Sequence, residues 1–232
     1  MSENIKKITK AFVVDLDSRE NQNILKPSAH PFNNQAHQVN EVAKKIYKLL
    51  IKGAKYPNDD IILNHNEIKE VFFSPFKPQL KNAQVFLSHS HADKNKALKV
   101  KNYLESETNH RVFIDSIFWD YKDDVLNKLA KYDNTSKIKD AFTLILRESL
   151  QNMIEKCPYF VFLESKNSVS NQGLSRITYS AWIYEELKIA HSIRESRPTP
   201  MMESWQVSHN ISPFLESLET ITLKKLSQQI NP

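Results

Sequence analysis

Residues 85–94, VFLSHSHADK, hold the densest group of side chains that could do chemistry. Imidazole and carboxylate groups are common ligands of zinc and iron, so His89, His91 and Asp93 are candidate metal ligands. Alternatively, the same residues could form the polar end of a buried strand that borders a ligand pocket. The spacing alone leaves both interpretations open.

A second candidate is a glutamate in the segment SAWIYEELKIAHSI, residues 180–193. With an advance of about 100° per residue in a helix, Glu186 falls near the middle of an apolar stripe. The stripe consists of Trp182, Ile183, Ile189, Ala190 and Ile193. A carboxylate on an apolar face costs free energy unless it is paired or opens onto a polar cavity, and such groups often have a function. The alternative is a helix rotated so that Glu186 reaches water or a lysine.

Short apolar runs alternate with helical patterns from residue 83 onward, at residues 83–88, 111–116 and 158–165. Runs that are apolar on both faces are typical of parallel strands covered by helices. We therefore predict an α/β domain over residues 81–232, with an open parallel sheet flanked by helices. Ligands bind outside the carboxyl ends of such strands, so the polar residues that follow the three runs are expected around one rim.

Residues 1–80 follow a different pattern, which we interpret as a mixed, mainly helical N-terminal extension with a regulatory role. Residues 11–17, AFVVDLD, are a candidate strand, and residues 38–53 have helical spacing. At the other end of the chain, residues 198–207 are the only candidate for a fourth strand of the sheet. Residues 214–230 are predicted to form a closing helix.

Composition narrows the function classes. Only two glycines, Gly53 and Gly173, are present among 232 residues, which excludes a glycine-rich phosphate loop or dinucleotide fingerprint. The single cysteine, Cys157, excludes an internal disulfide and is typical of a reducing compartment, so we expect a cytoplasmic protein. The net charge of +5 comes mostly from dispersed lysines, which predicts no specific nucleic-acid groove. Charges interrupt every N-terminal apolar run, so no membrane partner is expected.

Three motifs in a fixed order resemble the first strand, the second strand and a later helix of bacterial Toll/interleukin-1 receptor (TIR) domains. They are VFLSHSHADK, RVFIDS and SAWIYEEL, and the resemblance covers residues 82–193. It implies the flavodoxin-like fold of TIR domains. Many TIR domains cleave NAD at the nicotinamide–ribose bond with a glutamate four residues after a tryptophan. Here that glutamate is Glu186, which follows Trp182.

The resemblance implies a catalytic Glu186, NAD as substrate and no cofactor. The implied substrate-binding residues are Ser88, His89, Ser90, Asp115, Trp119 and Trp182. The implied products are nicotinamide and ADP-ribose, or a cyclic or derived ADP-ribose signal. Relatives commonly act in anti-phage defence as assembled homo-oligomers, so a further copy and an effector or sensor protein are implied partners. Residues 116–124 depart from the family, because their loop lacks the usual proline and glycine.

Three other interpretations are compatible with these residues. HSHAD also resembles the metal motif of metallo-β-lactamase-like hydrolases, but Lys94 stands where that motif has a histidine, so we expect no metal site. Some TIR domains are non-catalytic scaffolds for protein–protein assembly. Nucleoside deoxyribosyltransferases are related α/β enzymes whose glutamate attacks the sugar covalently. Single residues also have structural alternatives. Trp182 could belong to the hydrophobic core, and Asp115 or Trp119 could anchor a loop.

Overall fold

The computed structural model describes residues 10–25, 43–49, 65–74, 82–131, 136–172, 175–192 and 208–231. The chain divides into two compact units. The first comprises residues 1–31, 82–115 and 150–232, and the second comprises residues 32–81 and 116–149.

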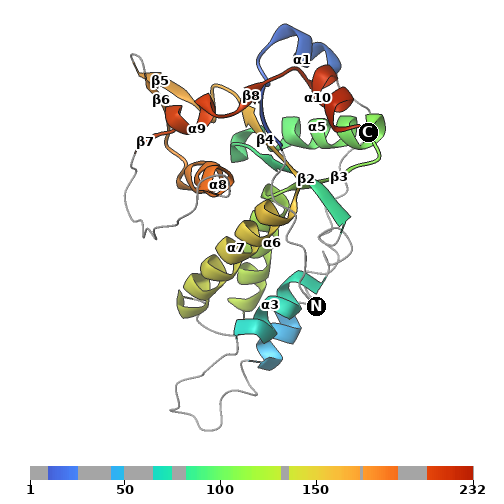
Figure 1. The fold of residues 1–232 in the computed structure, drawn as a ribbon. Helices are drawn as coiled ribbons and strands as arrows, with labels where there is room; N and C mark the ends of the chain where they lie inside the picture. Colours follow the sequence, from blue (N-terminus) through green and yellow to red (C-terminus); the bar gives the residue numbers. More distant parts are fainter. Residues whose placement is uncertain are drawn as a thin grey trace. The chain divides into compact units, whose positions relative to one another are not determined.

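A parallel sheet forms the centre of the first unit (Figure 1). Among the described residues it has five strands in the order β3-β2-β4-β1-β8. They are β1 (Lys10–Asp15), β2 (Ala83–Ser88), β3 (Arg111–Ile114), β4 (Tyr159–Glu164) and β8 (Glu219–Thr220). Side chains on both faces of β1, β2 and β4 are buried, as expected where helices cover a parallel sheet. The predicted α/β class, an open parallel sheet flanked by helices, is confirmed.

Strand β1 corrects the predicted division of the chain near residue 81. It pairs along its whole length with β4, from Lys10 opposite Tyr159 to Asp15 opposite Glu164, and its other edge pairs with β8. The first five residues of the run AFVVDLD therefore belong to an interior strand of the sheet and not to a separate extension. The physical reason is its uninterrupted apolar centre, which suits an interior strand of a parallel sheet whose two faces are both covered.

Helices of the first unit pack around this sheet. The helices α1 (Arg19–Ile24), α5 (Lys94–Glu107) and α10 (Leu223–Ile230) lie side by side, with α10 in contact with the other two (Figure 1). Helix α8 (Ala181–Ser192) contacts β2 and a small antiparallel sheet. That second sheet consists of β5 (Ser170–Gln172), β6 (Ser175–Thr178) and β7 (His209–Asn210).

The C-terminal segment differs from the predicted closing helix. A short helix, α9 (Ser212–Glu216), ends before β8, and α10 follows after Thr222, whose hydroxyl accepts a hydrogen bond from Lys225 N–H at 3.4 Å. The edge of β1 accounts for the interruption, because Ile221 N–H donates to Val13 O at 2.9 Å. The predicted fourth strand, residues 198–207, lies outside the described residues.

The described part of the second unit is helical. It contains a helix at residues 43–49, α3 (His65–Phe73), α6 (Ser116–Leu129) and the first part of α7 (Ser136–Lys156). Phe72 anchors its core, with ring centroids 5.1 Å from Tyr121 and 5.2 Å from Phe142. Helix α3 thus packs against the later helices α6 and α7. No helix in the described ranges is long and apolar enough to cross a membrane.

Candidate functional site

The carboxyl ends of β2 and β3 bring three predicted site residues to one edge of the sheet. Leu87 pairs with Ile114 in the parallel register, so Ser88, His89 and Asp115 follow at the same level. All three are buried. His89 Nδ1 lies 3.2 Å from Asp115 Oδ1. A histidine and a carboxylate that the sequence places 26 positions apart therefore form one buried pair.

Helix α8 adds Glu186 to this edge. The helix starts directly after β6, and Ser180 caps it by accepting a hydrogen bond from Ile183 N–H at 3.3 Å. Its buried face consists of Ile183, Glu186, Leu187, Ile189 and Ala190. Glu186 is only 1% exposed, whereas the adjacent Glu185 is half-buried. Three members of the predicted stripe, Ile183, Ile189 and Ala190, belong to this buried face together with Glu186, whereas Trp182 is half-buried.

The environment of Glu186 opposes its ionisation. Burial is the largest cause that raises the pKa of its carboxyl well above the ordinary value, and repulsion by Asp115 adds to it. The Ser88 hydroxyl acts in the opposite direction and lowers the pKa by a smaller amount. Ser88 and Asp115 are therefore polar neighbours of the carboxyl group.

Several buried polar atoms at this edge lack a hydrogen-bond partner among the described residues. They include Ser88 Oγ, both ring nitrogens of His89 and both carboxyl oxygens of Glu186. His89 Nδ1 lies near Asp115 Oδ1, but without hydrogen-bond geometry. Ser88 is close enough to influence the pKa of Glu186, yet the pair does not have hydrogen-bond geometry. Buried polar groups in native proteins are nearly always satisfied, so these five atoms at one place suit a polar ligand.

The other predicted binding residues have different positions. Ser90 precedes the 3-10 turn η3 (His91–Asp93), where its carbonyl accepts a hydrogen bond from Asp93 N–H at 2.8 Å. Trp182 is half-buried on α8, one turn before Glu186. Trp119 belongs to α6, and its side chain lies outside the described part of the chain. The described residues thus bring together Ser88, His89, Asp115 and Glu186.

The three side chains considered as metal ligands do not converge. His89 points to Asp115, His91 is exposed, and the Asp93 carboxylate is bound by side chains that follow β4. Within the described ranges, no group of three or more His, Cys, Asp or Glu side chains is placed to hold a metal ion.

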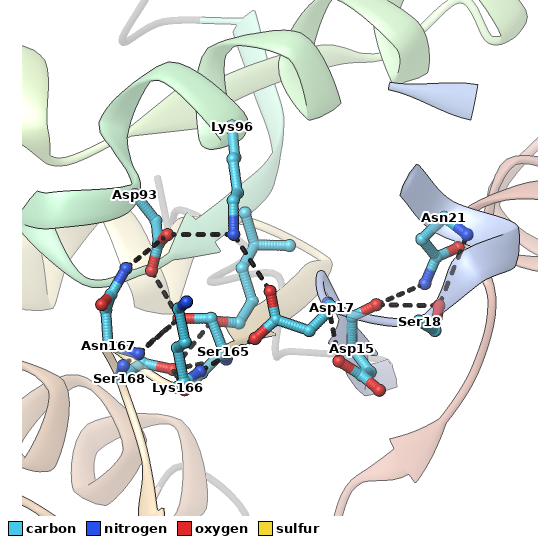
Figure 2. A network of polar contacts seen from close by, with 11 residues as sticks. Asp15, Asp17, Ser18, Asn21, Asp93, Lys96, Ser165, Lys166, Asn167 and Ser168 are labelled. Atoms are coloured by element: carbon cyan, nitrogen blue, oxygen red, sulfur yellow. Dashed lines mark hydrogen bonds and ion pairs between the residues drawn. The ribbon is translucent and has the colours of Figure 1, made fainter. Parts of the chain in front are cut away.

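Asp93 instead centres a polar network that the sequence did not predict (Figure 2). Ser165 Oγ donates to Asp93 Oδ2, and Asn167 Nδ2 donates to Asp93 Oδ1 at 2.9 Å. Lys96 Nζ lies 3.4 Å from the same Oδ1. The carboxylate therefore ties the loop after β4 to the start of α5. The only signal in the sequence was a polar residue directly ahead of a helix.

The same network reaches the loop after β1 (Figure 2). Lys96 Nζ contacts Asp17 Oδ1 at 3.1 Å, and Lys166 N–H donates to Asp17 Oδ2 at 3.0 Å. The hydrogen bond from Lys166 N–H is the main cause that lowers the pKa of Asp17. Every oxygen of Asp93 and Asp17 thus has a protein partner, which is typical of a structural cluster and contrasts with Glu186.

No family model, no curated protein and no solved structure matches this chain.

Proposed function

We propose that this protein is a TIR-type enzyme that cleaves NAD at the nicotinamide–ribose bond, with Glu186 as the catalytic carboxylate. The proposal rests mainly on the burial of the Glu186 carboxyl group and on its lack of hydrogen-bond partners. It is buried at the carboxyl edge of a parallel sheet, and neither of its oxygens has a hydrogen-bond partner among the described residues. A structural carboxylate would be paired, as Asp93 is.

The chemistry requires little besides this carboxylate. Nicotinamide is cationic in NAD and leaves as a neutral molecule, so its departure requires neither a general acid nor a metal. Positive charge then develops on the ribose, as in glycoside hydrolysis, and a fixed carboxylate stabilises that charge in the transition state. Water that attacks the ribose gives ADP-ribose, and an internal nucleophile gives a cyclic product.

The strand order supports the resemblance to TIR domains. Counted from β2, the first three strands lie in the order 2-1-3, which is the beginning of the flavodoxin-like order 2-1-3-4-5. The N-terminal β1 occupies the fourth position and β8 the fifth. The order reverses between β2 and β4, and ligands of such folds bind outside the carboxyl ends of the strands at that point. Ser88 ends β2 there.

Burial of the site supports a requirement for assembly. Glu186, Ser88, His89 and Asp115 are all buried, so a substrate reaches the carboxyl only after the groups that cover it move. We propose that contact between copies of the chain produces this movement, in the cytoplasm of a bacterium and as part of anti-phage defence. The trigger would be an effector or sensor protein.

The test is nicotinamide release from NAD by concentrated protein, with the products separated by chromatography. Wild type is compared with Glu186→Gln and with the neighbouring Glu185→Gln as a matched control. Release that is lost only in Glu186→Gln supports the proposal and identifies the product. Release that persists in Glu186→Gln removes this residue from the mechanism. No release by any variant favours the non-catalytic scaffold. A deoxyribosyl adduct trapped on Glu186 with a deoxynucleoside would instead identify a deoxyribosyltransferase.

A further inference from the structure

Strand β3 ends the strand order of the main sheet, so only one of its two edges is paired with another described strand, β2. The strand is short and covers four residues, Arg111–Ile114. An unpaired edge presents backbone N–H and C=O groups, which can pair with a strand of another chain. What binds these groups therefore determines whether the β3 edge can form such contacts.

Two side chains of helix α5 bind the backbone of Val112, the second residue of β3. Val112 N–H donates a hydrogen bond to Glu105 Oε1 at 2.9 Å. Lys101 Nζ donates a hydrogen bond to Val112 O at 2.7 Å. Because an N–H group has a single hydrogen to donate, Val112 N–H does not bond to β2 and is directed to the other edge of β3.

Lys101 and Glu105 also bind each other. They are four residues apart in α5, which places them on the same face of the helix. Lys101 Nζ donates to the same Glu105 oxygen that accepts from Val112 N–H. An ammonium group and a carboxylate oxygen thus occupy the positions that the N–H and C=O groups of a neighbouring strand would take. We call these two side chains the Lys101–Glu105 clip.

The clip binds the backbone groups that a second copy of the chain would use. In an antiparallel ladder, a hydrogen-bonded pair of opposite residues exchanges two N–H···O bonds. A twofold axis brings the same residue of each copy together. Val112 has both of its backbone groups at the outer edge of β3, so it is placed to pair with the Val112 of a second copy once the clip is removed.

We propose that the Lys101–Glu105 clip closes the β3 edge and prevents the sheets of two copies from joining there. A second copy is the relevant partner because its identical strand offers the complementary donor and acceptor at Val112. This proposal does not depend on the proposed function. It implies that assembly of wild-type copies uses surfaces other than the β3 edge.

The test removes the clip and measures the mass of the full-length protein in solution. Lys101→Met/Glu105→Ala removes the donor and the acceptor, and both new side chains favour a helix. Lys101→Arg/Glu105→Gln is the matched control, because it keeps a donor and an acceptor at the two positions. Asn102→Ala/Glu107→Ala, at two exposed positions of α5, controls for changes elsewhere on the helix. Size-exclusion chromatography with light scattering gives the mass over a concentration series.

Lys101→Met/Glu105→Ala is expected to approach about twice the wild-type mass as its concentration rises, whereas both control variants keep the wild-type mass. Hydrogen exchange followed by NMR locates the contact. At low concentration, Val112 N–H of this variant should exchange at least about tenfold faster than in wild type, because its acceptor is lost. In the associated form the same N–H should be protected again.

The proposal is overturned if Lys101→Met/Glu105→Ala keeps the wild-type mass at every concentration, or if it associates while Val112 N–H stays unprotected. Protection of Val112 N–H in wild type that disappears on dilution would also overturn it, because the clip lies within one chain. Circular dichroism checks that the variants are folded. If the double variant is unfolded, Glu105→Ala replaces it with Glu105→Gln as its control, and the same outcomes apply.

Discussion

The environment of Glu186 favours its neutral form, and this lowers the free energy of unfolding at a pH where the carboxyl group would otherwise be ionised. Because the pKa is raised in the folded protein, the folded state binds more protons than the unfolded state between the ordinary and the raised pKa. Wild type therefore loses stability relative to Glu186→Gln as the pH rises through this window. The difference in the free energy of unfolding between Glu186→Gln and wild type should grow by at most about 1.4 kcal/mol per pH unit.

Urea denaturation of both proteins between about pH 4 and pH 8 checks this expectation. Glu185→Gln is the control, because this neighbour is half-buried and belongs to the same turn of α8. If the difference in the free energy of unfolding between Glu186→Gln and wild type stays constant with pH, the raised pKa of Glu186 is contradicted.

Asp93 represents the opposite case, a buried carboxylate whose oxygens are occupied by protein donors. Asp93→Ala leaves the donors of Ser165 and Asn167 without an acceptor, so we expect a loss of about 2–3 kcal/mol in the free energy of unfolding. Asp123→Ala is the matched control. Asp123 pairs with Lys122 while its side chain is 64% exposed, and its loss should cost about 0.5 kcal/mol or less.

Chemical denaturation measures both aspartate variants. Equal effects would mean that the network in Figure 2 contributes no more than a surface ion pair.

At the same scale, part of the site could be predicted from the sequence. Helical spacing identified Glu186, and the rule for strand ends placed Ser88 and Asp115 on one rim. The contact of His89 with Asp115 could not be predicted, because it depends on the register of β2 against β3. Within HSHAD, His89 lies beside Asp115, His91 is exposed, and Asp93 is hydrogen-bonded to the loop after β4. No periodic pattern in the sequence distinguishes these three environments.

At the scale of elements, β1 lies between β4 and β8 and completes the sheet. Phe12, fully buried in this strand, makes its role testable. Phe12→Ala should destabilise the fold by about 3–5 kcal/mol, because it leaves a cavity in a core shared with β4. Lys10→Ala, at the exposed start of the same strand, should cost about 0.5 kcal/mol or less.

The midpoint of urea unfolding, followed by circular dichroism, compares the Phe12 and Lys10 variants. If residues 1–80 formed an independent extension, Phe12→Ala would leave the main unfolding transition unchanged.

The limits of prediction at this scale have physical causes. The apolar runs of β2, β3 and β4 were recognisable because strands buried on both faces are apolar throughout. The run of β1 was recognisable for the same reason, but its place beside β4 depends on pairing across almost 150 positions. The two-residue strand β8 shows no periodicity, and its flanking segments have helical spacing, so the sequence predicts one helix over residues 214–230.

At the scale of the whole molecule, the burial of Glu186 predicts that an isolated chain is a poor enzyme. We expect the rate of nicotinamide release per protein molecule to rise steeply with protein concentration, because assembly is proposed to uncover the site. The assay is run over a concentration series in parallel with light scattering. Full specific activity in a monomer at nanomolar concentration would contradict the requirement for assembly.

The most direct test of the central claim is the initial rate of nicotinamide release at high protein concentration for Glu186→Gln and Glu185→Gln beside wild type. We predict a rate at least about a hundredfold lower for Glu186→Gln, which lacks the charge that stabilises the transition state, and a nearly unchanged rate for Glu185→Gln. Wild-type release that survives in Glu186→Gln, or that is lost equally in both variants, would contradict the assignment of Glu186 as the catalytic carboxylate.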